Sequence, residues 1–168
     1  FLYGESTIRS DDNLIFCKKG FYDTKTDVSY FTRDARIEFD NKEIKADSLY
    51  YNRNLGFASA NENIVIIDTL NNSVLKGNYA EFFEKVDSAF VVGRAVAITN
   101  THKDSLFIHG DTILATGVPE ERIIRCYHHV KFFKSDLRGK CDSIHSNQGT
   151  GLTQMFAKPS LWPDGSQI

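Results

Sequence analysis

The side chains most suited to catalysis or metal binding are those of five histidines and three cysteines, and their spacing matches none of the common catalytic or metal-binding motifs. His128 and His129 are adjacent in a segment with strand-like alternation, so their side chains would face opposite ways and could not hold one metal ion together. Cys126 and His128 would share a face, but a metal site would need the distant histidines to converge on them. No Cys-x-x-Cys pair, Gly-x-Ser-x-Gly elbow or phosphate loop occurs. We therefore expect no enzyme, no cofactor and no metal site.

The cysteines Cys17, Cys126 and Cys141 are an odd number at wide spacing. We expect them to be small buried or half-buried residues, which is the usual place of a free cysteine. One disulfide is permitted if the compartment is oxidising, but the spacing does not require one. Their redox state stays open at this point.

Four acidic residues recur along the chain with a nearly constant period. Each follows a small or slender residue and precedes, two positions later, a large apolar one. Catalytic carboxylates are rarely repeated at such a period, so a structural role is favoured: carboxylate oxygens at strand ends or tight corners accept backbone N–H bonds. The members, spaced 34, 30 and 31 residues apart, are Asp47, Glu81, Asp111 and Asp142.

The composition is that of a folded domain, and it argues against nucleic-acid binding and against a membrane-spanning segment. Hydrophobic residues make up 41% of the 168 residues and charged residues 25%. The net charge is −2, and the basic residues are scattered among acids, which argues against nucleic acid. No apolar run approaches the roughly 20 residues that span a bilayer. The only basic groupings fit either a solvated face or a rim for lipid phosphates: Lys18-Lys19 and the set Lys131, Lys134, Arg138 and Lys140.

The elements that must position these residues are predicted to be strands. The chain has 13 Phe and 7 Tyr, residues that suit half-buried pleated surfaces. Apolar and polar residues alternate over 36–40, 94–99 and 129–132, and turn-forming clusters of Asp, Asn, Ser and Gly separate such segments. The best helix candidate, 78–86, is short. We predict a single all-β domain over 1–168, excised from a longer chain.

The period implies a unit of two strands and two turns, about 31 residues long, repeated roughly five times. One unit cannot bury its apolar face alone, but stacked copies form a continuous inner wall. The opposite face would carry polar residues such as Ser48 and Lys131 together with Val65, Ile67 and Val91, and a slip of one residue would invert the assignment. The predicted inner face is Leu49, Tyr51, Ile64, Ile66, Phe83, Phe90, Val92, Val96, Ile98, Ile113, Ile124, Val130, Phe132 and Ile144.

Several short segments, in this order and period, resemble one known family. They are 44–52, 56–58, 63–68, 76–83, 104–113 and 127–144. The chain from about Phe21 to Trp162 is similar to the OstA-like, or LptA-like, domain of periplasmic lipopolysaccharide transport, and its tail looks most like the Bacteroidetes branch. Each segment is short and degenerate, so the resemblance depends on their order and spacing.

The resemblance implies an open, twisted β-jellyroll (a β-taco) of stacked short antiparallel strands. It also implies that the predicted inner face shields the acyl chains of lipid A in the Gram-negative periplasm during export to the outer membrane. Further jellyroll modules of the export bridge, or other copies of the chain, would be partners through edge strands. An ATPase elsewhere would supply the energy.

Two other functions remain open from the residues alone. A structural β-solenoid or assembly scaffold would use the same inner face as a solid core, with no lipid cargo. Small residues at Gly56, Ala58, Gly93, Ala95 and Ala97 weigh against a solid core. A carbohydrate-binding jellyroll usually presents exposed Trp or Tyr platforms, and the single Trp162 gives it little support.

Overall fold

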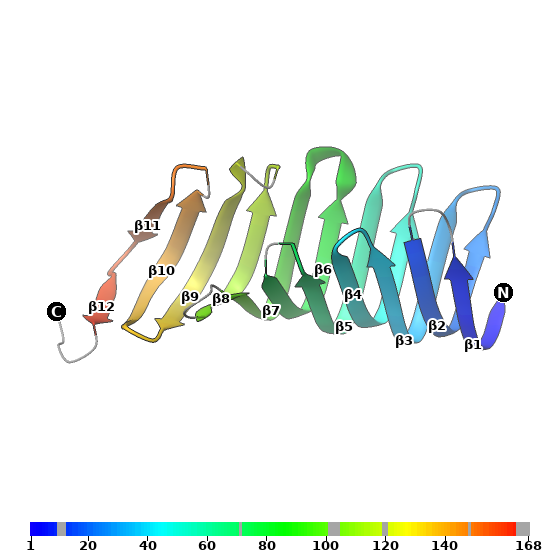
Figure 1. The fold of residues 1–168 in the computed structure, drawn as a ribbon, viewed down its shortest axis with the longest axis horizontal. Helices are drawn as coiled ribbons and strands as arrows, with labels where there is room; N and C mark the ends of the chain where they lie inside the picture. The colour runs from blue at the N-terminus through cyan, green and yellow to red at the C-terminus, as the bar shows by residue number, and fades with distance from the viewer. Residues whose placement is uncertain (10–12, 71, 101–104, 119–120, 148, 164–168) are drawn as a thin grey trace.

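The computed structural model describes residues 1–9, 13–70, 72–100, 105–118, 121–147 and 149–163, and it confirms the all-β class. One open, twisted antiparallel sheet runs through the described chain in sequence order, from β1 at one end to β11 at the other (Figure 1). β12 pairs with β10 beside β11. The strands are β1 (Leu2–Arg9), β2 (Asn13–Asp23), β3 (Val28–Phe39), β4 (Lys42–Asn52), β5 (Phe57–Asp68), β6 (Ser73–Phe83), β7 (Ser88–Asn100), β8 (Ser105–Thr116), β9 (Ile123–Lys134), β10 (Leu137–Asn147), β11 (Leu152–Phe156) and β12 (Ser160–Pro163), with a 3₁₀ turn, η1 (Glu84–Val86).

Each long strand bends at its middle, and the bends lie side by side. The register shifts there in every pairing from β1–β2 to β9–β10. On β3, β5, β7 and β9 two consecutive residues take positive φ, a left-handed conformation that bends a strand where a bulge forms. We call this row of bends the fold line; its pairs are Arg33-Asp34, Glu62-Asn63, Gly93-Arg94, His128-His129 and, between β11 and β12, Ala157-Lys158.

The fold line divides the sheet into two layers that fold onto each other, as the curved strands of Figure 1 show. The first layer contains the half-strands 28–32, 48–52, 57–61, 79–83, 88–92, 112–116, 123–127 and 143–147. The second layer contains 35–39, 42–46, 64–68, 73–77, 95–100, 105–110, 130–134 and 137–141. The strands of 11 to 13 residues from β2 to β10 are therefore longer than the short strands expected, because each one serves both layers.

The core lies between the layers and is made of rows of directly paired residues. Each row continues across the sheet because neighbouring strands keep their register on either side of the fold line. The row of the first layer nearest the fold line is Phe31, Leu49, Ala60, Ala80, Val91, Ile113, Cys126 and Ile144. All eight are buried. The facing row of the second layer is Ile37, Ile44, Ile66, Leu75, Ala97, Ile108 and Phe132, all packed against this cluster.

On β4, β6, β8 and β10 the layers approach so closely beside the fold line that these strands have small residues there. A Cβ at Gly77 of the second layer would lie 2.2 Å from Cγ1 of Val91 in the first. A Cβ at Gly110 would lie 2.3 Å from Sγ of Cys126. Ala46 and Cys141 occupy the same place on β4 and β10, and both are buried. The small residue that recurs in the sequence therefore marks the line where the two layers meet.

The strand ends farthest from the fold line, together with the turns that connect them, form two edges that we call the lips, one for each layer. Within each lip, neighbouring turns are hydrogen-bonded to each other. Along the first-layer lip, backbone hydrogen bonds link successive turns: Arg53 N to Asp27 O at 3.1 Å, Glu84 N to Gly56 O at 2.8 Å and Gly117 N to Asp87 O at 3.1 Å. The second-layer lip has the same arrangement, with Thr69 N to Asn41 O and Asn100 N to Asn72 O, both at 2.9 Å. In each lip, hydrogen bonds thus join successive turns into one continuous row.

The segment 78–86, the best helix candidate of the sequence, is not a helix. Its first part belongs to β6, which pairs with β5 and β7 through Phe83, and only Glu84–Val86 form a single 3₁₀ turn. The apolar spacing that resembled a helix arises because Tyr79, Phe82 and Phe83 lie on both faces of a strand whose two faces are partly apolar.

Candidate functional site

An apolar slot lies between the two layers at the middle of the sheet. Its volume is about 190 Å³. The second layer contributes branched side chains to its wall, and the first contributes a row of alanines next to the core row, so the slot is open where the alanines leave space. The principal lining residues are Leu49, Ala58, Ala60, Ala80, Phe82, Ala89, Ile113, Ala115 and Ile124 from the first layer, and Ile37, Ile44, Ile66, Leu75 and Ala97 from the second.

Most of the charged residues that border the slot lie at its lips, and Glu81 of β6 also borders it. On the first-layer lip, Arg122 donates from Nη2 to Asp87 Oδ2 at 3.3 Å and from Nε to the Gly117 carbonyl at 3.3 Å. On the second-layer lip, Lys42 lies opposite Asp68 in the strand register, and its Nζ is 5.8 Å from the centre of the Phe39 ring. The wall is therefore hydrocarbon with a polar mouth, an arrangement that fits an amphiphile with its tail inside.

Eight of the fourteen residues predicted for the inner face lie in the core cluster or pack against it. Four of these eight also line the slot, and Ile98 borders the slot near the lip. Tyr51 lies in the same cross-strand row as slot-lining Ala58 and is half-buried. The eight core residues are Leu49, Ile64, Ile66, Ile113, Ile124, Val130, Phe132 and Ile144.

The remaining four, Phe83, Phe90, Val92 and Val96, lie on outer faces, and the alternation places Ile98 on an outer face too, which corrects the predicted register of β7. In β7 the buried residues are Val91 and Ala95, and Ala97 packs against them, so Phe90, Val92, Val96 and Ile98 have the opposite orientation, although Ile98 also borders the slot at the lip. Phe90 instead packs on Tyr79 with ring centres 6.1 Å apart. The larger residues of β7 face outward because the inner wall of this strand is kept small, and the count of alternate residues from Phe83 therefore indicated the wrong face.

Phe83 also lies on an outer face, and the inward-facing residue is its neighbour, one position earlier. Phe83 is 38% exposed and packs on Phe57, with ring centres 5.2 Å apart, on the outer side of the first layer. Its neighbour Phe82 lines the slot instead. A prediction based on cross-strand pairing with Ala58 and Ala89 would have selected Phe82, since both partners lie in the inner row.

Three of the four repeated acids lie at the fold line. Asp47 Oδ2 accepts a hydrogen bond of 3.0 Å from Asn63 Nδ2, a left-handed residue on the next strand. Asp111 and Asp142 contact the left-handed histidines of β9. Glu81 is misaligned: the equivalent position on β6 is Asn78, whose Oδ1 accepts from Arg94 Nη2 at 3.5 Å.

Glu81 lies three residues further along β6 and accepts a hydrogen bond from the Tyr79 hydroxyl. With Asn78 in place of Glu81, the spacing becomes 31, 33 and 31 residues, more regular than the acid series itself. The repeated feature is thus an oxygen acceptor, carboxylate or amide, that holds the left-handed corner of its neighbour.

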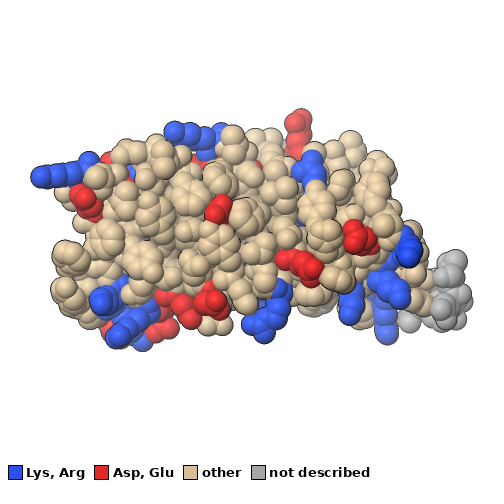
Figure 2. Space-filling model, turned by 180° about the vertical axis from the view of Figure 1, so that it is seen from behind, with Lys and Arg blue, Asp and Glu red and all other residues tan. Residues whose placement is uncertain are grey.

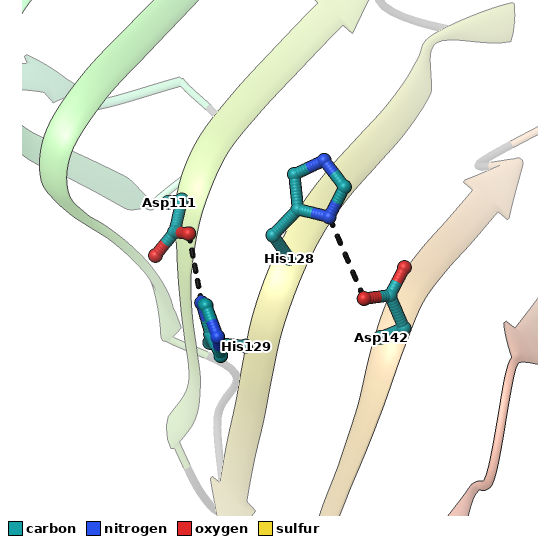
Figure 3. Close-up of polar contacts among 4 residues, drawn as sticks. All are labelled: Asp111, His128, His129 and Asp142. Carbon is teal, nitrogen blue, oxygen red and sulfur yellow. Dashed lines mark hydrogen bonds and ion pairs between the residues drawn. The ribbon is translucent and has the colours of Figure 1, made fainter.

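His128 and His129 point away from each other, as Figure 3 shows. His129 Nδ1 lies 2.8 Å from Asp111 Oδ2 on β8, and His128 Nδ1 lies 3.4 Å from Asp142 Oδ1 on β10. All four side chains are at least half exposed. Within the part of the chain that the structure describes, no group of three His, Cys, Asp or Glu residues is arranged to hold a metal ion. The two pairs bridge three strands at the fold line.

The three cysteines are buried free thiols. Burial, with a smaller contribution from neighbouring Cys141, raises the pKa of the Cys126 thiol to about 12. Burial also raises the pKa values of Cys17 and Cys141. Since the thiolate is the reactive form, none of the three is set up as a nucleophile.

We expect the native protein to react slowly with a thiol reagent such as Ellman's reagent at neutral pH. For Cys126, a pKa near 12 means a thiolate population about a thousandfold below that of an ordinary cysteine. All three thiols should react once the protein is unfolded in guanidinium chloride. One thiol reacting at the free-cysteine rate in the folded protein would contradict this packing.

The outer face of the first layer carries few charges. Figure 2 views the molecule from this side and shows a broad area without Lys, Arg, Asp or Glu, with charged residues mainly toward its margins. Tyr30, Tyr50, Phe57, Phe90 and Tyr79 lie on it and form tilted ring pairs with one another or with nearby aromatics. Much of the aromatic surplus of the sequence is therefore placed outside the slot.

The fold and the slot together define the class: an LptA-like sheet folded over an apolar interior. A solved structure with this fold is LptH from Pseudomonas aeruginosa, described as the LptA homologous periplasmic component of the conserved lipopolysaccharide transport device. The two structures superpose with a TM-score of 0.61 at 17% sequence identity, over 76% of this chain and 86% of LptH. The resemblance of the sequence to this class is thus confirmed at the level of the fold.

No family model and no curated protein matches the sequence. No helix among the described residues has the length and apolarity needed to cross a membrane.

Proposed function

We propose that this protein is a periplasmic lipid-binding module that shields the acyl chains of lipopolysaccharide in the slot during export to the outer membrane. The observation that carries the proposal is the slot lined mostly by hydrocarbon, with its charged groups mainly at the lips. The LptA-like fold supports it, since LptH is a component of a lipopolysaccharide transport device. Carriage of this kind requires no catalytic group.

The chemistry of the slot suits a carrier that must release its cargo. A wall made mainly of Ile, Leu, Ala and Phe side chains offers contact area with few hydrogen-bonding groups. Each methylene of a ligand that leaves water contributes about 0.8 kcal/mol. Affinity should therefore rise with acyl length and depend little on the sugar, which would remain outside the lips.

The slot as it stands holds only part of such a lipid. An apolar cavity of roughly 150 Å³ binds benzene, so 190 Å³ accommodates a segment of one chain. Several acyl chains would require the lips to separate. The layers are continuous through the strands at the fold line, and each lip is hydrogen-bonded along its own length, so we infer that opening occurs by rotation about the fold line with both lips intact.

The two ends of the sheet offer edges for further modules. β1 has one paired neighbour, β2, and the C-terminal end presents β11 and β12 beside β10 (Figure 1). We propose that another jellyroll module of the export bridge, or a second copy of the chain, adds strands there and continues the slot. Light scattering over a range of concentrations tests this, and a mass that stays monomeric at the highest concentration would exclude self-stacking.

Photocrosslinking distinguishes a lipid slot from a solid scaffold core. We expect a photoreactive amino acid at Ile66, in the slot wall, to crosslink to lipopolysaccharide in cells. The same residue at Phe90, on the outer face of the first layer, is the matched control and should give protein crosslinks or none. Lipid adducts at neither position, or equally at both, would reject the lipid slot and favour the scaffold function.

A further inference from the structure

A second apolar surface lies outside the slot, on the outer face of the second layer. Two rows of directly paired residues cross this face from β5 to β12. The row nearer the lip is Ile67, Val74, Ile98, Phe107, Phe133, Arg138 and Trp162. The row nearer the fold line is Val65, Lys76, Val96, His109, Lys131, Lys140 and Ser160. Val74 and Ile98 also border the slot at the lip.

The alternation of the strands fixes the outward direction of these rows. Val130, Ala95 and Cys141 are buried in the core, and Phe132 packs against it, so the intervening side chains face away from the slot. Phe107 is 39% exposed and Phe133 43% exposed. Both are large apolar residues on a surface that nothing in the described chain covers.

The charge on these rows has one sign. Lys76, Lys131, Arg138 and Lys140 are exposed, none of them has an ion-pair partner among the residues that the structure describes, and neither row contains an acid. The neighbouring strands β3 and β4 differ, because there Glu43 pairs with cations of both strands. On β3 and β4 the cations of the outer face are thus paired with an acid, whereas the rows from β5 onward carry cations and no acid.

Cations and aromatic rings are brought together on this face. The Arg138 guanidinium lies 5.3 Å from the centre of the Phe133 ring, and Lys140 Nζ lies 5.5 Å from that of Trp162. Lys131 is directly opposite Lys140 in the register. Like charges in directly opposed positions destabilise a sheet, and an anionic surface placed against them would relieve the repulsion.

We propose that this outer patch, formed by Lys76, Lys131, Arg138 and Lys140 with Phe107, Phe133 and Trp162, docks the protein on an anionic phospholipid bilayer. This goes beyond carriage of a lipid in the slot, because it assigns a second lipid contact to the opposite face of the same layer. Cations attract anionic headgroups, and aromatic rings insert at the level of the interface.

The shape and composition of the patch favour a bilayer over an acidic protein. It extends across the outside of a sheet and has no described cavity into which a partner side chain would fit. Its contacts are repeated along rows and are not gathered about one central anchor, whereas protein interfaces concentrate binding in a few buried residues. The first layer lacks this combination: its outer face is mostly uncharged (Figure 2).

Co-sedimentation with large unilamellar vesicles tests the proposal. Vesicles of phosphatidylcholine mixed with phosphatidylglycerol should bind the wild-type protein, and vesicles of phosphatidylcholine alone should not. Each cation near an anionic surface contributes a factor of about five in partitioning. The double variant Lys131→Glu/Lys140→Glu should therefore lose at least about 25-fold. Phe133→Ser should also weaken binding.

Matched controls separate the patch from total charge and from the slot. Lys19→Glu/Lys25→Glu makes the same charge change elsewhere on the surface, and Phe156→Ser removes a ring that is 42% exposed, against 43% for Phe133. Both should bind vesicles as the wild type does. So should Ala89→Phe, which fills the slot, so that failure of the slot function leaves this result unaffected.

Three outcomes would overturn the proposal. They are equal binding to neutral and anionic vesicles, equal losses in the patch variants and their controls, and wild-type protein that stays in the supernatant. The last would leave an acidic protein as the occupant of the patch.

Discussion

Replacing Ala89 by phenylalanine is expected to abolish lipid binding while leaving the protein folded. Ala89 lies between Phe82 and Ala115 in the inner row, and all three line the slot. A phenylalanine there would occupy the space that the alanines leave. We expect at least a tenfold loss of affinity for a fluorescent fatty acid, about 1.4 kcal/mol or more, by direct titration.

The thermal midpoint distinguishes a blocked slot from a damaged fold. Filling a cavity commonly stabilises a protein by about 0.5–2 kcal/mol, and where the cavity is functional the cost is activity. Ala89→Phe should therefore keep or raise the midpoint while losing the lipid. Ser88→Phe is the control, since Ser88 pairs with outward-facing Phe83 and its side chain lies on the other face. Equal lipid loss in both variants would show that the slot is not where the probe binds.

Adding a single methyl group at Gly110 is expected to destabilise the whole domain. The new Cβ of Gly110→Ala would lie 2.3 Å from Sγ of Cys126, and the next nearest atom is the Tyr127 carbonyl oxygen at 3.3 Å. Overpacking of this kind costs about 1–3 kcal/mol. For a chain of this size each kcal/mol lowers the melting temperature by about 2–4 °C, which calorimetry or circular dichroism resolves.

A double-mutant cycle assigns that cost to the contact between the layers. Cys126→Ala removes the sulfur atom that the new methyl group would meet, so the pair Gly110→Ala/Cys126→Ala should recover most of the loss caused by Gly110→Ala. Coupling of about 1 kcal/mol or more is expected for side chains in contact. Additive effects would show that the layers adjust around the methyl group without strain.

The sequence predicted the architecture better than the orientation of its strands. Alternation and turn clusters indicated an all-β chain with a repeat of about 31 residues, because those signals are local to each strand and turn. The assignment of faces counted every second residue from the large apolar residue of each repeat, and it gave inner positions for residues such as Ile64 and Val130, where a large side chain does fill the core.

That assignment was wrong in β7, and the reason is physical. An open slot needs small residues on its inner wall, so Val91, Ala95 and Ala97 face inward while Phe90 and Val96 are left outside. The outer rows of the second layer also contain apolar residues, such as Val65 and Ile67. When both faces of a strand are apolar, alternation no longer indicates which one is buried.

The fold line could not be predicted from single residues. Its left-handed pairs include Arg33, Glu62 and Ala157, which have no special preference for positive φ, along with Asn63 and His129, which adopt it more readily. The bends follow from the geometry of two layers closing on a common core. The repeated oxygen acceptor on the neighbouring strand was the one sequence signal of these corners.

The order of strands in the sheet follows the order of the chain, so each hairpin depends only on the hairpin before and the one after. Such a molecule behaves as a one-dimensional array, in which free energy is a sum of units and their nearest-neighbour interfaces. Its lips can then separate from each other by a local rotation about the fold line over two or three strands, while the rest stays closed and the turns within each lip stay hydrogen-bonded. A lipid could advance along the slot with a local opening that travels with it, and a whole-molecule transition would be unnecessary. The length of the sheet can vary as well, because one pair of strands can be gained or lost without changing the cross-section of the slot.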